Sequence, residues 1–234
     1  MPSFPKNCLK IENLAVYRSD LPLFEPVSFS VSAGESLQIS GTNGSGKTSL
    51  LRCICGISHR HEGRILWNTD VSGNENDLVA GNSSQDNTLD MYRNMLYIGH
   101  SLGLKPKLTV EQNLKFYQQL RFSENAELIE TALALLNIEI YHDEQVGNLS
   151  AGQKRRVSLA RLLTEPVSLW ILDEPMVALD LAGQAWLEKV CNQHIADGGL
   201  ILLTSHQEIT GIDGLVQLEL READIQILET EAKL

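Results

Sequence analysis

Residues 37–52 read LQISGTNGSGKTSLLR, and the order of residue types in this stretch decides the fold. Residues 37–40 have the apolar character of a short buried strand, and an apolar helical pattern opens at Ser49. Between them, Gly41–Thr48 matches G-x-x-x-x-G-K-[ST], the phosphate-binding P-loop, in the strand–loop–helix order that this motif requires. The stretch therefore predicts an α/β nucleotide-binding domain.

The chemistry of this loop explains its spacing. Three glycines within six positions admit backbone angles closed to other residues, so several N–H groups can turn toward one phosphate. The helix that follows adds the positive end of its dipole. Lys47 is placed to reach the β- and γ-phosphates of a nucleotide, and Thr48 to offer its hydroxyl to Mg²⁺. The predicted nucleotide-binding residues of the loop are Gly41, Thr42, Asn43, Gly44, Ser45, Gly46, Lys47, Thr48 and Ser49.

Bulk composition limits the possible functions. The chain has 234 residues, of which 43% are hydrophobic, and a net charge of −11. Its length suits one large α/β domain or two joined lobes. The negative charge argues against nonspecific affinity for nucleic acid or acidic lipid. The four cysteines form no C-x-x-C pair, which favours reduced thiols in a cytosolic compartment. We expect membrane association only through a partner, because no stretch reaches 18 apolar residues and no signal pattern opens the chain.

Strand patterns flank the P-loop. Residues 8–17 and 23–32 predict two strands before it, and 63–67 predict another after it. Tyr17 ends the first strand, where its ring could stack on a nucleotide base or simply pack on the core. Residues 68–92 are rich in Asn, Asp, Ser and Gly and predict a long surface loop, which favours a solvated insertion over a binding role.

Helical periodicity dominates the middle of the chain. A strand at 95–98 precedes two predicted helices, at 109–120 and 124–137, for which Thr109 and Ser123 are candidate N-caps. We expect these helices to form a lobe separate from the strands around the P-loop.

A second candidate anion site lies at residues 149–153, LSAGQ, directly before an amphipathic helix with a basic first turn. Ser150 is a natural N-cap, and the N–H groups of Gly152 and Gln153 are expected to project from the helix start. An ordinary helix cap containing one glycine is the alternative interpretation.

Residues 168–175, SLWILDEP, form an apolar strand pattern that ends in adjacent carboxylates, which is the Walker B pattern. Asp173 is expected to hold Mg²⁺ and Glu174 to polarise the attacking water. His206, at the end of a later strand, can hydrogen-bond a phosphate oxygen. The remaining predicted elements are a turn at 177–180, a helix over about 182–196, a strand at 200–203 and a closing β-hairpin over 214–228.

With these motifs in this order, the chain resembles the ATP-binding cassette (ABC) ATPase family over essentially its whole length. LSAGQ differs by one residue from the usual LSGGQ signature, and residues 177–180 match the D-loop. The resemblance implies an α/β P-loop NTPase with a RecA-like core, an N-terminal antiparallel β subdomain and a helical signature subdomain. It also implies a single domain over 1–234, divided into a core (1–98 and 155–234) and a helical lobe (about 101–154).

The family resemblance implies a shared catalytic mechanism. Two copies pair head to tail, and each ATP lies between the P-loop of one subunit and the signature of the other. ATP binding closes the homodimer, and hydrolysis reopens it. The residues implied on one side are catalytic Lys47, His100, Glu174 and His206, the Mg²⁺ ligands Thr48 and Asp173, and base-stacking Tyr17. The other subunit contributes Ser150, Ala151, Gly152 and Gln153. The resemblance also implies that Asp180 is the D-loop residue.

His100 departs from the family pattern, which usually has Gln at this position. An amide can contact Mg²⁺ and the attacking water in any protonation state, whereas a histidine can do so only when neutral. We therefore expect the activity to fall below about pH 6, near the reference pKa of histidine.

Further matches look like one subfamily, the ATPase subunit of the haem exporter in bacterial cytochrome c maturation. They include Gly-His at 99–100, Gly-Leu-Lys at 103–105, Leu-Thr at 108–109 and Thr-Ser-His-Gln at 204–207. The resemblance implies a peripheral protein on the cytoplasmic face of the inner membrane, bound to integral-membrane subunits. Hydrolysis would drive haem export or release haem from a periplasmic haem chaperone.

Two features leave alternatives open. The polar stretch 68–92 departs from the compact pattern of that subfamily, and His59, His61, His142 and His194 have no recognisable haem-binding context. The partners are therefore expected to handle haem.

The alternative function is a soluble, non-transport ABC ATPase, such as a scaffold subunit for iron–sulfur cluster assembly. Cell fractionation separates this function from that of a membrane-bound transporter subunit.

Overall fold

The first strands of the chain form an antiparallel sheet. A computed structural model describes residues 4–68, 84–221 and 223. In it, β1 (Cys8–Arg18) pairs antiparallel with β3 (Val27–Ser32) on one side and β5 (His61–Asn68) on the other, while β2 (Leu21–Pro22) pairs with the end of β1. The predicted strand at 23–32 is wrong in its first four residues. Pro26 has no N–H to give to a ladder, and β3 begins directly after it.

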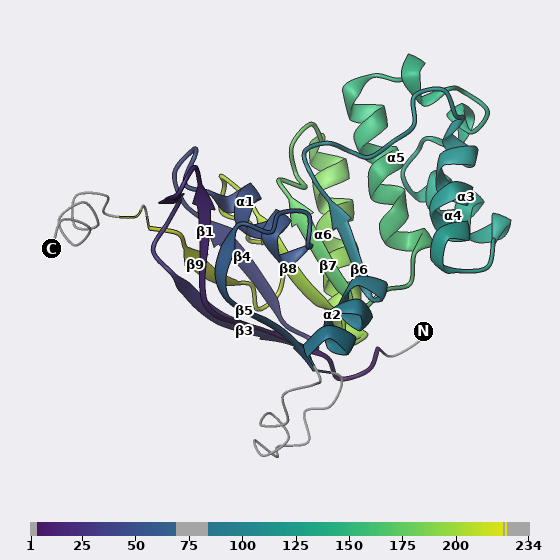
Figure 1. The fold of residues 1–234 in the computed structure, drawn as a ribbon. Coiled ribbons are helices and arrows are strands. Elements are labelled where there is room, and N and C mark those ends of the chain that lie inside the picture. The colour runs from purple at the N-terminus through teal and green to yellow at the C-terminus, as the bar shows by residue number, and fades with distance from the viewer. Residues whose placement is uncertain (1–3, 69–83, 222, 224–234) are drawn as a thin grey trace, which may run out of the picture.

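A second, parallel sheet carries the motifs. Its strand order is β6-β7-β8-β4-β9 (Figure 1), and each neighbouring pair is parallel. The strands are β4 (Ser36–Ser40), β6 (Met95–Ile98), β7 (Leu169–Asp173), β8 (Leu200–Thr204) and β9 (Val216–Glu219). Every residue of β7 and β8 is buried, which explains their unbroken apolar runs. The predicted hairpin over 214–228 is wrong for its described part, because β9 adds in parallel to β4 at the sheet edge. Residues 222 and 224–228 lie outside the described chain.

Helices cover the parallel sheet and build a lobe beyond it (Figure 1). Their bounds are α1 (Lys47–Ile54), α2 (Ser84–Arg93), α3 (Val110–Arg121), α4 (Ala126–Leu135), α5 (Ala151–Thr164) and α6 (Leu181–Ala196), with short 3₁₀ helices η2 (Glu139–Tyr141) and η3 (Val146–Asn148). A capping box at Thr109 confirms the predicted start of α3. The cap predicted at Ser123 is wrong. Asn125 caps α4 instead, and its side chain accepts the Leu128 N–H at 3.0 Å.

The loop predicted over 68–92 is wrong at both ends. Asn68 closes β5, and residues from Ser84 onward form α2, while residues 69–83 lie outside the described chain. The polar composition hides α2, but Met91 is fully buried and Trp67 Nε1 donates to Asp90 Oδ2 at 3.3 Å. Tertiary packing on β5 therefore outweighs the low helix propensity of this segment.

Among the described residues, three apolar clusters form the core. The first lies between the two sheets and includes the buried side of α1, the second includes α6 and strands of the parallel sheet, and the third lies within the helical lobe. Helix α5 joins two of them, since Leu159 packs in the second cluster while Val157 and Ala160 pack in the third. The predicted border between residues 154 and 155 falls inside this helix, and the division of the chain into core and lobe stays a prediction.

Candidate nucleotide-binding site

The P-loop lies at the carboxyl end of β4, a strand inside the parallel sheet, and leads into α1. Gly46 is the N-cap of α1 and has φ +98°, and a Cβ at this position would lie 2.7 Å from the ring of Phe24. Both the backbone angle and the ring therefore require glycine. Lys47 is 6% exposed, and its Nζ donates to the carbonyls of Gly41 (2.8 Å) and Thr42 (2.9 Å).

A pocket of about 280 Å³ opens over this loop. It brings together part of the P-loop, the first turn of α1 and the segments that follow β7 and β8. Its lining residues are Arg18, Leu23, Asn43, Gly44, Gly46, Lys47, Thr48, Ser49, Glu174 and His206. Predicted site residues from three separate motifs, the P-loop, Glu174 after β7 and His206 after β8, therefore meet in one hollow.

Asp173 lies buried at the end of β7, and its two carboxylate oxygens differ. Oδ1 accepts hydrogen bonds from the hydroxyls of Thr48 (3.1 Å) and Thr204 (2.8 Å). Oδ2 is buried and has no hydrogen-bond partner among the described residues. A buried carboxylate oxygen without a partner, beside the Thr48 hydroxyl, fits the oxygen ligands that Mg²⁺ requires. The two predicted metal ligands are thus neighbours.

Glu174 and His206 are also in contact. Glu174 has φ +50°, and its N–H donates to Thr204 Oγ1 at 2.9 Å. Its Oε1 lies 3.3 Å from His206 Nε2, and its Oε2 accepts the His206 N–H at 3.3 Å. The carboxylate that follows the Walker B strand and the histidine that follows β8 therefore form one pair at the edge of the pocket.

The signature residues lie elsewhere. Ser150 caps α5, as predicted, but a capping box consumes the donor that was expected to project. The Gln153 N–H donates to Ser150 Oγ (3.3 Å), while the Ser150 N–H donates to Gln153 Oε1 (2.8 Å). The expectation of a free Gln153 N–H is therefore wrong. The described lining of the P-loop pocket includes no signature residue of the same chain, that is, none of Ser150, Ala151, Gly152 and Gln153.

Seven other predicted site residues are absent from the described pocket lining as well: Gly41, Thr42, Ser45, Asp173, Tyr17, His100 and Asp180. The Tyr17 hydroxyl donates to Glu62 Oε2 at 3.0 Å, and desolvation together with Glu62 raises the pKa of Tyr17. His100 is exposed in the bend after β6. Asp180 caps α6 and accepts both the Gly183 N–H (3.0 Å) and the guanidinium of Arg156 (2.8 and 2.9 Å), contacts that lower the pKa of Asp180.

Some residues of the site were missed by sequence reasoning. Arg18 and Leu23 enter the pocket from the antiparallel sheet, where no motif marks them. Thr204 stands opposite Asp173 in the parallel register of β7 and β8, which a single chain read in order does not reveal. Arg155 was interpreted only as part of the basic first turn of an amphipathic helix. The spacing of the sequence could have indicated its burial, because Arg155 shares one helix face with Leu159 and Leu162.

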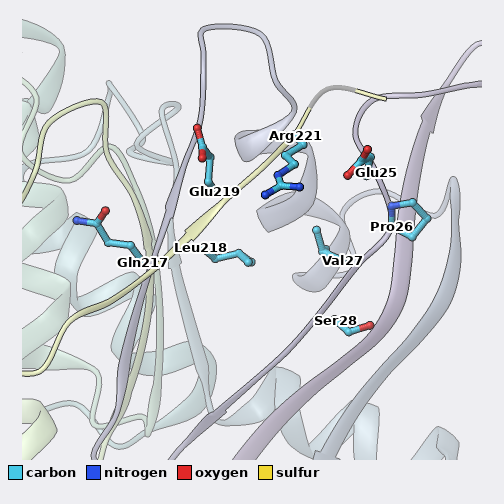
Figure 2. A pocket seen from close by; sticks show the side chains of 8 residues that line it. All are labelled: Glu25, Pro26, Val27, Ser28, Gln217, Leu218, Glu219 and Arg221. Atoms are coloured by element: carbon cyan, nitrogen blue, oxygen red, sulfur yellow. The ribbon is translucent and has the colours of Figure 1, made fainter. Parts of the chain in front are cut away.

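A larger hollow, of about 370 Å³, lies outside this site (Figure 2). It forms where the edge strands β3 and β9 of the two sheets approach, and the Glu25 N–H donates to the Arg221 carbonyl there at 3.0 Å. Its lining residues are Glu25, Pro26, Val27, Ser28, Gln217, Leu218, Glu219 and Arg221. None of them belongs to the predicted site, so the hollow marks the junction of the sheets.

Within the described part of the chain, no helix has the length and apolarity needed to cross a bilayer.

The fold and the pocket define a P-loop ATPase of the ABC type. The family model described as ABC transporter matches residues 24–177, and the chain belongs to this family of ATP-hydrolysing transporter subunits. A curated relative, the cytochrome c biogenesis ATP-binding export protein CcmA of Aliivibrio fischeri, is 41% identical over 201 residues, which are 86% of this chain and 93% of that protein.

Solved structures agree on the fold. A putative ABC transporter ATP-binding protein from Pyrococcus furiosus aligns with a TM-score of 0.74 at 24% identity, over 92% of this chain and all of that one. The dimeric bacterial ABC transporter cassette MJ0796 aligns with a TM-score of 0.72 at 20% identity, over 90% of this chain and 94% of that one. The predicted α/β ABC ATPase fold is confirmed.

Proposed function

We propose that this chain is the ATP-hydrolysing subunit of a membrane ABC complex for cytochrome c biogenesis. Hydrolysis powers haem export or releases haem from a periplasmic haem chaperone. The relative at 41% identity is an ATP-binding export protein of cytochrome c biogenesis, which supports this process, and the alignment over 93% of that protein supports the transfer to the whole chain. The subunit lies on the cytoplasmic face of the bacterial inner membrane and binds integral-membrane subunits.

One observation carries the catalytic part of this proposal. The pocket over the P-loop is lined by Glu174, His206 and Thr48. Next to Thr48, the buried Oδ2 atom of Asp173 has no hydrogen-bond partner among the described residues. Thr48 and Asp173 would hold Mg²⁺, which would supply neutralisation of the phosphate charge.

The remaining side chains of the pocket act on the nucleotide and on water. Lys47 leaves its two loop carbonyls to meet the β- and γ-phosphates. Glu174 accepts a hydrogen bond from the attacking water and orients it, and His206 holds both the Glu174 carboxylate and a γ-phosphate oxygen. His100 takes the place of the usual Gln, and Tyr17 supplies a ring at the base.

The second half of each site comes from a second copy of the chain. Ser150, Ala151, Gly152 and Gln153 sit at the start of α5 and away from the pocket of their own subunit, which suits a contribution to the other one. The helix start offers the Gly152 N–H and a positive dipole end to the γ-phosphate. Arg156, on the helix that follows the signature, forms an ion pair with Asp180. The signature and the D-loop therefore contact the second copy together.

The first experiment compares ATP hydrolysis by wild type and Glu174→Gln, purified in detergent with the proteins that accompany them. We expect the variant to bind ATP and dimerise while its kcat falls at least 100-fold, since the amide cannot accept the proton of the attacking water (on the order of 10²–10⁴ for such groups). Small integral-membrane proteins should accompany both forms.

Two results would contradict the proposal. Hydrolysis by Glu174→Gln at the wild-type rate removes the catalytic assignment. An active protein that fractionates alone and away from membranes removes the transport assignment and favours the non-transport ABC ATPase.

A further inference from the structure

Arg155 is a buried cation that the motifs do not explain. It lies on α5, five residues after Ser150, and only 5% of it is exposed. Burial lowers the pKa of its guanidinium, while the charges of Asp173 and Glu174 oppose that shift. Burying a charge without a paired carboxylate is costly, so the contacts that hold it must matter to the fold or to the site.

Each hydrogen bond described for this guanidinium ends on a backbone carbonyl. Nε donates to Pro175 O (3.3 Å), and Nη2 donates to Asp173 O (3.3 Å) and to Glu174 O (2.5 Å). Nη1 reaches Gly99 O at 3.5 Å, in the loop directly before His100. One side chain of the signature helix therefore holds the loop after β7 and touches the loop after β6.

The Glu174 peptide is consequently held from both sides. Its φ of +50° lies in the left-handed region, which a residue with a Cβ adopts only when its surroundings enforce it. Thr204 Oγ1 takes the N–H of Glu174, and Arg155 donates to its carbonyl. These two contacts fix the backbone from which the carboxylate reaches His206.

We propose that Arg155 is a positioning residue for ATP hydrolysis, which acts by holding the Glu174 backbone in the conformation that aims its carboxylate into the pocket. The inference rests on the hydrolytic role proposed for Glu174. Since Arg155 and Ser150 belong to the same helix, a displacement of the signature end of α5 reaches the Glu174 peptide through one side chain. ATP binding itself does not require Arg155, because the described P-loop contacts do not include it.

The test measures kcat and KM for ATP, together with ATP-dependent dimerisation, in Arg155→Met and Arg155→Lys. We expect Arg155→Met to lower kcat at least tenfold while KM stays within threefold and dimerisation persists. Arg155→Lys keeps the charge but cannot reach all the carbonyls with one ammonium, so its kcat should fall between those of Arg155→Met and wild type.

Arg161→Met is the matched control. Arg161 is a buried arginine of the same helix, 7% exposed, and it pairs with Glu165 at 2.6 Å, away from the pocket. Its loss should lower the melting temperature but leave kcat per folded molecule within twofold of wild type.

The outcomes separate cleanly. A folded Arg155→Met with wild-type kcat, or with a raised KM and unchanged kcat, overturns the inference. If Arg155→Met does not fold, Arg155→Lys decides, and wild-type kcat in that variant overturns it as well. If Glu174→Gln is inactive while the Arg155 variants are fully active, only this inference fails. If Glu174→Gln hydrolyses ATP normally, the proposed function fails with it.

Discussion

At the scale of single residues, Asp173 and Glu174 show what a sequence motif predicts about a site and what it does not. Residue types and spacing were enough to predict Thr48, Asp173, Glu174 and His206 as neighbours, and the structure brings them together. The contacts that orient them were not predictable, because Thr204 and Arg155 act from a neighbouring strand and a distant helix. Such partners depend on strand register and helix packing, which leave no local pattern in the sequence.

His100 offers a test at this scale. An imidazolium can no longer accept a hydrogen bond or approach Mg²⁺, whereas an amide keeps its acceptor oxygen when the solution is acidified. We expect kcat of the wild type to fall on acidification, and His100→Gln to hold its activity further into acid. The measurement is the pH–rate profile of both forms. An acid limb that does not move in His100→Gln would show that another group titrates.

At the scale of elements, helices with a clear apolar period or a capping residue were predicted correctly. Elements without such a pattern were not. The capping residues of α3 and α5 were identified from sequence, since Thr109 and Ser150 each form a capping box. Helix α2 and strand β9 were not, because both depend on what they pack against. Polar α2 is held by Met91, and β9 is defined by its pairing with β4.

Helix α6 makes a pH-dependent contact with β7. His194 is 5% exposed, stacks on Trp170 with 3.7 Å between ring centroids, and places Nε2 3.1 Å from Ser168 O. Desolvation lowers the pKa of His194 from 6.5 to about 4, so the folded state favours the neutral ring. The stabilisation is complete above pH 6.5 and is lost as the pH falls toward 4.

We therefore expect the free energy of unfolding to fall by about 2 kcal/mol between pH 7.5 and pH 5 through this group. Urea denaturation at both values measures it. His194→Phe keeps a stacked ring without a titrating group, so its stability should fall by less over the same interval. An equal loss in both proteins would assign the acid sensitivity to the carboxylates.

At the scale of the whole molecule, helix α5 connects the parallel sheet with the helical lobe. Its side chains pack in the apolar cluster beside the sheet and in the cluster within the lobe. The P-loop leads into α1 beside the strands of the parallel sheet, and the signature leads into α5, which lies toward the helical lobe (Figure 1). The overall fold was predictable because the P-loop, the signature, the Walker B strand, the D-loop and His206 follow one another in the order of the ABC ATPase family. The assembly of two copies is not contained in a single chain and stays a proposal.

Mixed dimers test that assembly. Lys47→Ala and Ser150→Phe should each be inactive alone, because every site of either homodimer lacks one half. A mixture should regain about a quarter of wild-type activity if exchange is random. Half of its dimers are then mixed, and one of the two sites in each is intact. Steady-state hydrolysis against mixing ratio gives the result, and a mixture as inactive as its components would place both residues in one subunit's site.

Lys47 rests on the carbonyls of Gly41 and Thr42, and this resting position sets a threshold for ligand choice. Any anion that recruits the ammonium must compensate for two hydrogen bonds already made. A free phosphate has only its own oxygens to offer in exchange. A nucleotide brings contacts from base, sugar and the other phosphates as well, so the loop's own backbone competes with small anions and favours the larger ligand.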